Sequence, residues 1–171
     1  MTTMENKEDI LKKLGSEEIQ LRQEALAAVK NEGDITIVPA LLDILTTAKD
    51  HKTTEELVNL LADIKDNAFP QIVIDRIRTT TETIPKSRLL RLCWESALDF
   101  SPYIVLFAEL TLQEDFIVAL EASTAIENIH RIDEEKRTAA IRILKQGSPS
   151  EEKQFLIDNA LHFLTNYTEE D

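Results

Sequence analysis

Glycine and cysteine are scarce in this sequence. The chain of 171 residues contains 3 Gly and 1 Cys. Few glycines leave little material for tight β-hairpins, and few segments alternate apolar with polar residues, so the sequence favours an all-α fold. A single cysteine excludes an intramolecular disulfide. The apolar neighbours of Cys93 favour a buried side chain over a reactive thiol.

Long hydrophobic runs and positive charge are also lacking. No run approaches the roughly 18 apolar residues of a membrane span, and segment 1–15 has no apolar core of the secretory type. We therefore expect a cytoplasmic protein that binds no membrane. The 32 acidic and 19 basic residues give a formal net charge of −13. Because such a charge repels phosphate backbones, we expect no nucleic-acid partner.

Proline marks the expected helix starts. It is harmless in the first turn of a helix, where its missing N–H would have no acceptor. Pro39, Pro70 and Pro102 are spaced by 31 (70 − 39) and 32 (102 − 70) residues, and an aliphatic pair follows each of them. A fixed period of this size predicts a helical repeat. The residues three positions earlier are of capping type and are the predicted N-caps: Thr36, Asn67 and Asp99.

The other two prolines and the apolar stripes complete the predicted helices. Pro85 and Pro149 also begin amphipathic segments, and Ser148 with Glu151 predicts a capping box. The predicted fold is an all-α superhelix of four antiparallel helix pairs in one domain over residues 1–171. Flanking helices at about 5–14 and 149–166 are expected to cap the stack. The predicted repeats cover about 17–48, 53–79, 85–112 and 115–146.

One predicted repeat, 14–45, carries a specific pattern. An Arg and small residues precede a Gly-Asp turn, and a Val-Pro-x-Leu-Leu segment follows it. The residues of this pattern are Arg22, Ala25, Ala28, Gly33, Asp34, Val38, Pro39, Leu41, Leu42 and Leu45. The pattern closely resembles a HEAT repeat of the bacterial kind. The later predicted repeats keep the spacing but lose the Gly-Asp turn.

The resemblance implies a right-handed superhelix whose second helices line a concave groove that binds a protein or peptide. It also implies that Arg22 and Asp34 serve packing between successive repeats. HEAT-like enzymes exist, but the sequence lacks the His-Glu pairs of a metal hydroxylase, the basic groove of a DNA glycosylase and a glycine-rich phosphate loop. We therefore expect no catalysis, metal or cofactor. A HEAT-like enzyme or lyase-type accessory and a homo-oligomeric structural protein are the alternatives.

Candidate partner-binding residues occupy the second helices. Tyr103 and Phe107 lie four residues apart, on one helix face, and predict an exposed aromatic patch next to Asp75, Arg76 and Arg142. The alternative is that both aromatic side chains pack against neighbouring helices.

Three other residues favour structural roles. Trp94 lies on an apolar stripe, which favours a core position over an interface anchor. His130 and His162 fall near helix ends or apolar faces, where structural or surface roles are favoured over proton chemistry.

Overall fold

The computed structural model describes residues 4–32 and 34–168, so Gly33 of the HEAT-like pattern lies outside the described residues. Within these ranges the chain forms ten α-helices, two 3-10 helices and no strand. None of the described helices is both long and apolar enough to cross a membrane. The elements are α1 (Met4–Leu14), α2 (Ile19–Glu32), η1 (Ile35–Ile37), α3 (Val38–Thr47), α4 (His51–Ala62), α5 (Phe69–Thr79), α6 (Thr83–Glu95), η2 (Ser101–Tyr103), α7 (Ile104–Gln113), α8 (Phe116–Glu127), α9 (Glu134–Gln146) and α10 (Glu151–Thr165).

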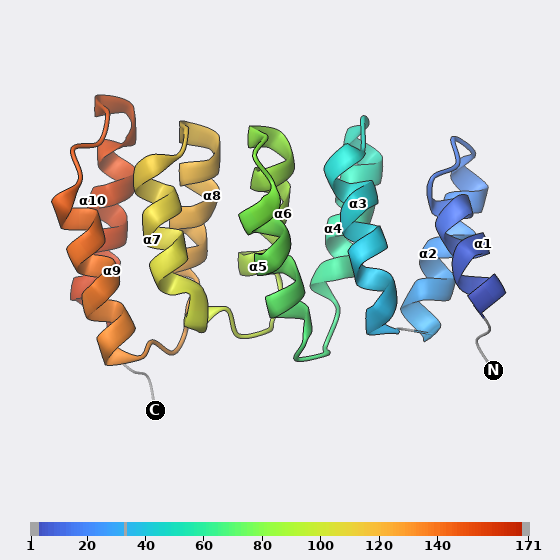
Figure 1. Cartoon of the computed structure of the whole chain (residues 1–171), viewed down its shortest axis with the longest axis horizontal. Coiled ribbons are helices and arrows are strands. Elements are labelled where there is room, and N and C mark those ends of the chain that lie inside the picture. The colour runs from blue at the N-terminus through green and yellow to red at the C-terminus, as the bar shows by residue number, and fades with distance from the viewer. Residues whose placement is uncertain (1–3, 33, 169–171) are drawn as a thin grey trace.

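Short turns decide which helices pack as pairs. They join α1 to α2, α3 to α4, α5 to α6, α7 to α8 and α9 to α10, and the two helices of each pair are in contact (Figure 1). Longer loops, such as 63–68 and 96–103, connect one pair to the next. Because a short turn favours antiparallel packing, the pairing is shifted by one helix from the predicted repeats. α1 and α10 are therefore members of pairs and not separate caps.

The pairs stand side by side and form two layers (Figure 1). The odd-helix layer contains α1, α3, α5, α7 and α9, and the even-helix layer contains α2, α4, α6, α8 and α10. One continuous cluster of buried residues fills the space between them, from Ile10 to Leu164. α6 contacts helices of both layers, including α3, α4, α5 and α8.

The prolines lie at or near helix starts, as predicted, but most of the predicted caps are wrong. Pro39 and Pro70 are the second residues of α3 and α5. Aspartates close the turns before the proline-bearing helices: Asp34 Oδ1 accepts from Thr36 N, Asp66 Oδ1 from Ala68 N and Asp99 Oδ1 from Ser101 N, at 2.8–2.9 Å. A short carboxylate reaches the amide two residues on, so Asp99 closes its turn as an acceptor, whereas Thr36 and Asn67 do not cap.

The predicted capping box before α10 is also wrong. The N-cap of α10 is Ser150 and not Ser148, and no side-chain hydrogen bond caps this helix. Glu151 is the first residue of the helix, so it is too close to the N-cap to complete a capping box with it.

Cationic side chains satisfy carbonyl groups where other helices end. Arg88 of α6 donates to the carbonyl oxygens of Leu45 and Ala48 at the end of α3, both at 2.9 Å. Lys153 of α10 donates to Leu112 O and Glu114 O at the end of α7, both at 2.7 Å. The last carbonyls of a helix have no partner within it and lie at the negative end of its dipole. These cations therefore hold one helix pair to another.

Arg22 and Asp34, which the HEAT resemblance places in the packing between repeats, make local contacts in the structure. Arg22 Nη1 donates to Ser16 O at 2.9 Å, within the first helix pair. Asp34 accepts from the amide and the hydroxyl of Thr36. Lys7 of α1 donates to Thr36 O at 2.7 Å and so joins the first pair to the start of α3.

Asp115 is the N-cap of α8, and replacing it is expected to have a pH-dependent cost. Its carboxylate accepts from Val118 N at 3.1 Å and from the hydroxyl of Thr83 on α6. The Thr83 hydrogen bond, followed by backbone bonds, lowers the pKa of Asp115 against the opposing effect of burial. At pH 7, Asp115→Ala should lower the free energy of unfolding by about 1 kcal/mol.

The direction of the pH dependence follows from the linkage between proton binding and folding. The folded pKa lies below the unfolded one, so the carboxylate stabilises the fold fully above the unfolded pKa, and this contribution is lost as pH falls through the folded pKa. Urea denaturation of both proteins at several pH values should show the difference shrinking below about pH 4. Asp158→Ala, at an exposed position within α10, is the control and should change little. An equal difference at pH 7 and pH 3 would contradict the assignment.

Candidate functional site

Three of the predicted binding residues form hydrogen bonds or ion pairs on the odd-helix layer: Tyr103, Asp75 and Arg76. The hydroxyl of Tyr103 donates to Gln71 Oε1 at 2.9 Å, and Gln71 Nε2 donates to Asp75 Oδ1 at 2.7 Å. Arg76, on the next position of α5, forms an ion pair with Asp43 of α3. Burial is the main cause that raises the pKa of the half-buried Tyr103 hydroxyl. The structure thus brings Tyr103 and Asp75 together in a hydrogen-bonded chain between η2 and α5.

The predicted aromatic patch does not form. Phe107 is fully buried, at 0% exposure, between the layers, so only Tyr103 of the pair reaches the surface. Tyr103 lies in η2, before α7 begins at Ile104, so the two residues do not share one helix face. Arg142 is exposed on α9. Within the described part of the chain it forms no hydrogen bond or ion pair with the other predicted binding residues. The alternative, core packing, is right for Phe107.

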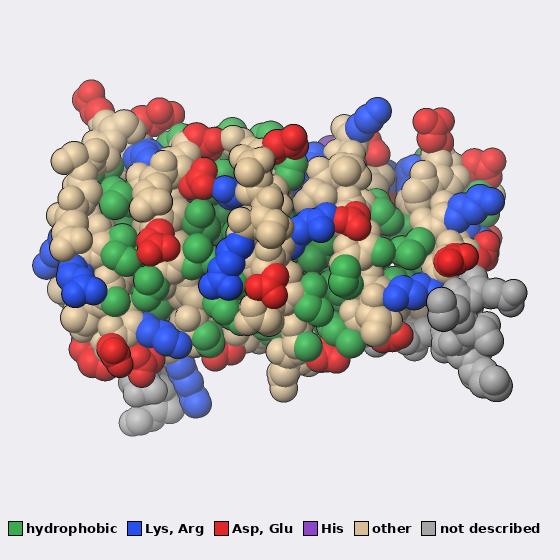
Figure 2. Space-filling view, in the orientation of Figure 1, with side chains coloured by type: hydrophobic (Ala, Val, Ile, Leu, Met, Phe, Trp, Pro, Cys, Tyr) green, Lys and Arg blue, Asp and Glu red, His purple; other side chains and the backbone are tan. Residues whose placement is uncertain are grey.

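A shallow groove runs between α3 and α5 on this layer. Its volume is about 240 Å³, and three apolar and three polar residues line it: Pro39, Leu42, Ile72, Asp75, Arg76 and Thr79. Figure 2 shows this face, where hydrophobic side chains are visible between the helices and charged side chains are distributed over the whole face. The groove combines aliphatic side chains with Asp75 and with the Arg76–Asp43 ion pair.

A polar network crosses the even-helix layer. Arg91 of α6 donates from Nη2 to Glu55 Oε2 of α4 at 2.8 Å and also pairs with Glu95. Hydrogen bonding from Arg91 lowers the pKa of Glu55. Trp94 is half-buried and packs against the core cluster, as the sequence favours, and its Nε1 donates to Glu121 Oε2 of α8 at 2.8 Å. Burial raises the pKa of Glu121, and the Trp94 hydrogen bond opposes that shift.

Exposed apolar side chains lie on this same layer. All of the large exposed ones among the described residues belong to even-numbered helices: Ile19, Ile84, Ile117, Leu120 and Phe155. One sequence feature, separate from the apolar stripes of the helices, indicates the exposed side chains of α8. Segment 116–120 is apolar at every position, and a helix cannot bury five consecutive residues on one face. Some of these side chains must therefore face outward.

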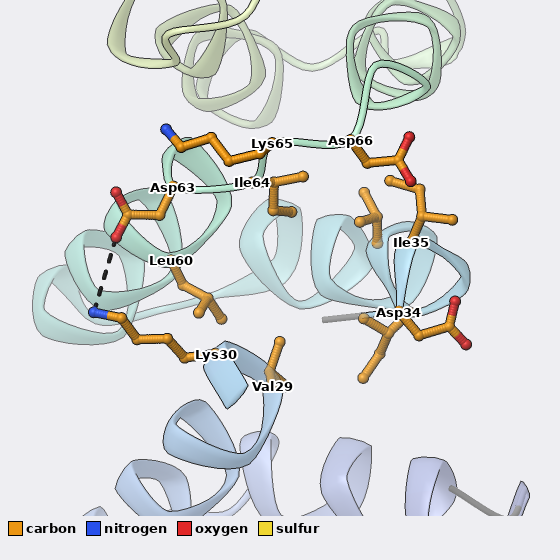
Figure 3. Close-up of a pocket in the computed structure, with 11 residues that line it drawn as sticks. Val29, Lys30, Asp34, Ile35, Leu60, Asp63, Ile64, Lys65 and Asp66 are labelled. Atoms are coloured by element: carbon orange, nitrogen blue, oxygen red, sulfur yellow. Dashed lines mark ion pairs between the residues drawn. The ribbon is translucent and has the colours of Figure 1, made fainter. Parts of the chain in front are cut away.

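A pocket of about 450 Å³ lies where the first helix pair meets the second (Figure 3). Aliphatic side chains such as Val29, Ile35 and Leu60 form part of its walls, and the charged lining residues are Lys30, Asp34, Asp63, Lys65 and Asp66. Lys30 Nζ and Asp63 Oδ2 approach to 4.0 Å across one side of the mouth. The volume and the apolar walls suit an apolar side chain or a small hydrophobic molecule.

A wider cleft of about 620 Å³ lies at the ends of α8 and α10, and it contains both histidines that the sequence places near helix ends. The hydroxyl of Tyr167 donates to His130 O at 2.7 Å and accepts from Ile132 N at 3.2 Å. His162 is exposed and contacts Asn166. Tyr167 therefore anchors the end of α10 to the loop before α9, which gives this cleft a structural framework.

The described part of the chain contains neither a cluster of metal ligands nor an exposed cysteine. No group of three or more His, Cys, Asp or Glu side chains there is placed to hold a metal ion. Cys93 is buried, and desolvation raises the pKa of its thiol. A neutral buried thiol is a poor nucleophile, so Cys93 acts as the small core side chain that the sequence predicts.

The fold and these surfaces define a two-layered all-helical protein with an exposed apolar region on one layer. In comparisons with known proteins, no family model matches the chain, and no curated protein matches it.

Proposed function

We propose that this chain is a HEAT-like α-solenoid, one domain over residues 1–171, that binds a protein or peptide partner and performs no catalysis. The stacked helix pairs and the continuous core between the two layers support a solenoid. The HEAT-like pattern in segment 14–45 supports the same assignment.

The distribution of exposed apolar side chains carries the binding proposal. Ile84 and Phe155 are about half exposed, and both lie on the even-helix layer with the other exposed large apolar residues. Single apolar side chains on a surface are ordinary, but a group on one layer is typical of an interaction surface. The surface differs from the one implied by the resemblance, because it lies on the first helices of the predicted repeats and on the predicted C-terminal capping helix, and not on the second helices.

Capture and reconstitution test this function. The immobilised full chain is incubated with lysate of the source organism, and beads carrying an unrelated protein of similar net charge are the control for non-specific capture. We expect a protein that is retained only by the chain and forms a defined complex with it when both are purified, as measured by light scattering after size exclusion.

Two results would contradict the proposal. A stable homo-oligomer that forms no complex with any captured protein would favour the structural alternative. A small molecule that co-purifies with the chain in native mass spectrometry, again without a protein partner, would favour the enzyme or accessory alternative.

A further inference from the structure

Four large apolar side chains lie exposed near the beginnings of α6, α8 and α10. Their exposed fractions are 48% for Ile84, 44% for Ile117, 39% for Leu120 and 51% for Phe155. We call these residues the α6–α8–α10 patch. Each lies in the first half of its helix, and the three helices belong to the same layer.

Contacts between the helix starts hold the three helices of this patch side by side. The hydroxyl of Thr83 bonds the N-cap Asp115, which fixes the start of α6 beside the start of α8. The rings of Phe116 and Phe155 lie with their centroids 6.1 Å apart and join α8 to α10. Ile84 lines a groove of about 400 Å³ together with Glu121, which is one helical turn after Ile117. The patch therefore spans three adjacent helices.

Its dimensions suit a helix that lies across the layer. Packed helices are about 8–10 Å apart, so the span from α6 to α10 is roughly 16–20 Å. A helix rises about 1.5 Å per residue, so about 14 residues would cover the patch. Side chains three and four residues apart share one helix face, which allows a single apolar stripe to contact all three helices.

Negative charge surrounds the patch. Glu82 and Asp115 are exposed at the starts of α6 and α8, and Glu151 and Glu152 are exposed in the first turn of α10. Glu121 lies beside the patch on α8.

The nearby cations are largely engaged elsewhere. Lys86 donates to Glu114 Oε1 at 2.6 Å, Lys153 to the carbonyl groups at the end of α7, and Arg91 to Glu55 and Glu95. Lys49 and Arg88 line the same groove as Ile84, and Arg88 donates to the carbonyl groups at the end of α3. A partner with Lys or Arg beside its apolar stripe would meet complementary charge, whereas a second copy of this chain would bring a second acidic rim to the same surface.

We propose that the α6–α8–α10 patch docks an amphipathic helix of another protein, with apolar residues on one face and Lys or Arg beside them. This inference rests on the proposed function and names the surface and the partner chemistry. The apolar stripe packs on Leu120 and Phe155, and the basic residues approach Glu151 and Glu152.

Fluorescence anisotropy with three labelled synthetic peptides of about 14 residues tests the proposal. The first is a Leu- and Lys-containing amphipathic helix, the second is its charge-reversed Leu- and Glu-containing form, and the third is a scrambled sequence of the first. We expect the full chain to bind the first peptide at least about tenfold more tightly than either of the others.

Variants locate the site. Leu120→Ser and, separately, Phe155→Ser should each weaken binding of the basic amphipathic peptide about tenfold. Ile19→Ser removes an equally exposed apolar side chain from α2, outside the patch, and should leave the affinity unchanged. Circular dichroism verifies the fold of each variant, and Ile117→Ser replaces any variant that loses its helical signal.

Equal affinity for the three peptides, or unchanged affinity in the patch variants, would overturn the proposal. So would a dimer of the chain that Leu120→Ser dissociates in light-scattering measurements. A partner captured from lysate and retained by the Leu120→Ser variant would overturn this surface assignment while leaving the proposed binding function intact.

Discussion

Replacing Phe107 by alanine is expected to lower the free energy of unfolding by about 3–5 kcal/mol. The side chain is at 0% exposure between the two layers, and it is one of the largest fully buried side chains of the described residues. Its removal loses the favourable transfer of the ring from water and leaves a cavity that close-packed neighbours fill only in part. The midpoint and the slope of urea denaturation, followed by circular dichroism, measure this change.

Phe155→Ala is the matched control, because it makes the same chemical change at a ring that is about half exposed on α10. Because this ring also packs against Phe116, we expect the change to cost about 0.5–1.5 kcal/mol, well below the loss expected at Phe107. Comparable losses in the two variants would mean that the ring of Phe107 has much less core packing than its burial indicates. A Phe107→Ala protein that keeps wild-type stability would restore the exposed aromatic patch as a hypothesis.

For Phe107, the helix could be predicted from the sequence, but the burial of its side chain could not. The helical character of its segment follows from apolar periodicity and from a proline near the helix start, and the structure confirms an all-α chain. Which face of the helix is buried depends on where its neighbours pack. Tyr103 belongs to a short 3-10 helix at 101–103, before α7 begins, so a spacing of four residues does not place the two rings on one α-helical face.

The spacing of the prolines could not predict which helices pack as pairs. A proline shows where a helix can begin, because it lacks an amide hydrogen. A proline gives no information about whether its helix pairs with the preceding helix or with the following one. The lengths of the connections supply that constraint, because prolines follow both kinds: Pro70 follows the longer loop 63–68, and Pro85 follows the short turn 80–82.

The exposed apolar surface could be predicted in part. The uninterrupted apolar segment 116–120 indicates a helix that is apolar on more than one side. The contribution of Ile84 and Phe155 could not be found this way, because neither lies in an apolar segment as long as 116–120. Only the parallel alignment of α6, α8 and α10 brings them beside α8.

Lys153→Met is expected to lower the free energy of unfolding by about 2–3 kcal/mol. Lys153 is 9% exposed, and its ammonium group donates to Leu112 O and Glu114 O, both at 2.7 Å. Methionine keeps much of the aliphatic stem but leaves these two carbonyl groups without their donor. Because they lie at the end of α7, the variant also removes a positive charge from the negative end of that helix dipole.

Lys145→Met provides the comparison that separates this contact from a general effect of charge. Lys145 is exposed in the last turn of α9, so both variants raise the negative net charge by one, but only Lys153→Met uncovers buried acceptors. Chemical denaturation should show a loss within about 0.5 kcal/mol for Lys145→Met. Equal losses in the two variants would show that water replaces the ammonium group at the end of α7. A loss confined to Lys153→Met would establish that a cation from one helix pair stabilises the helix end of another, the same arrangement that Arg88 makes at the end of α3.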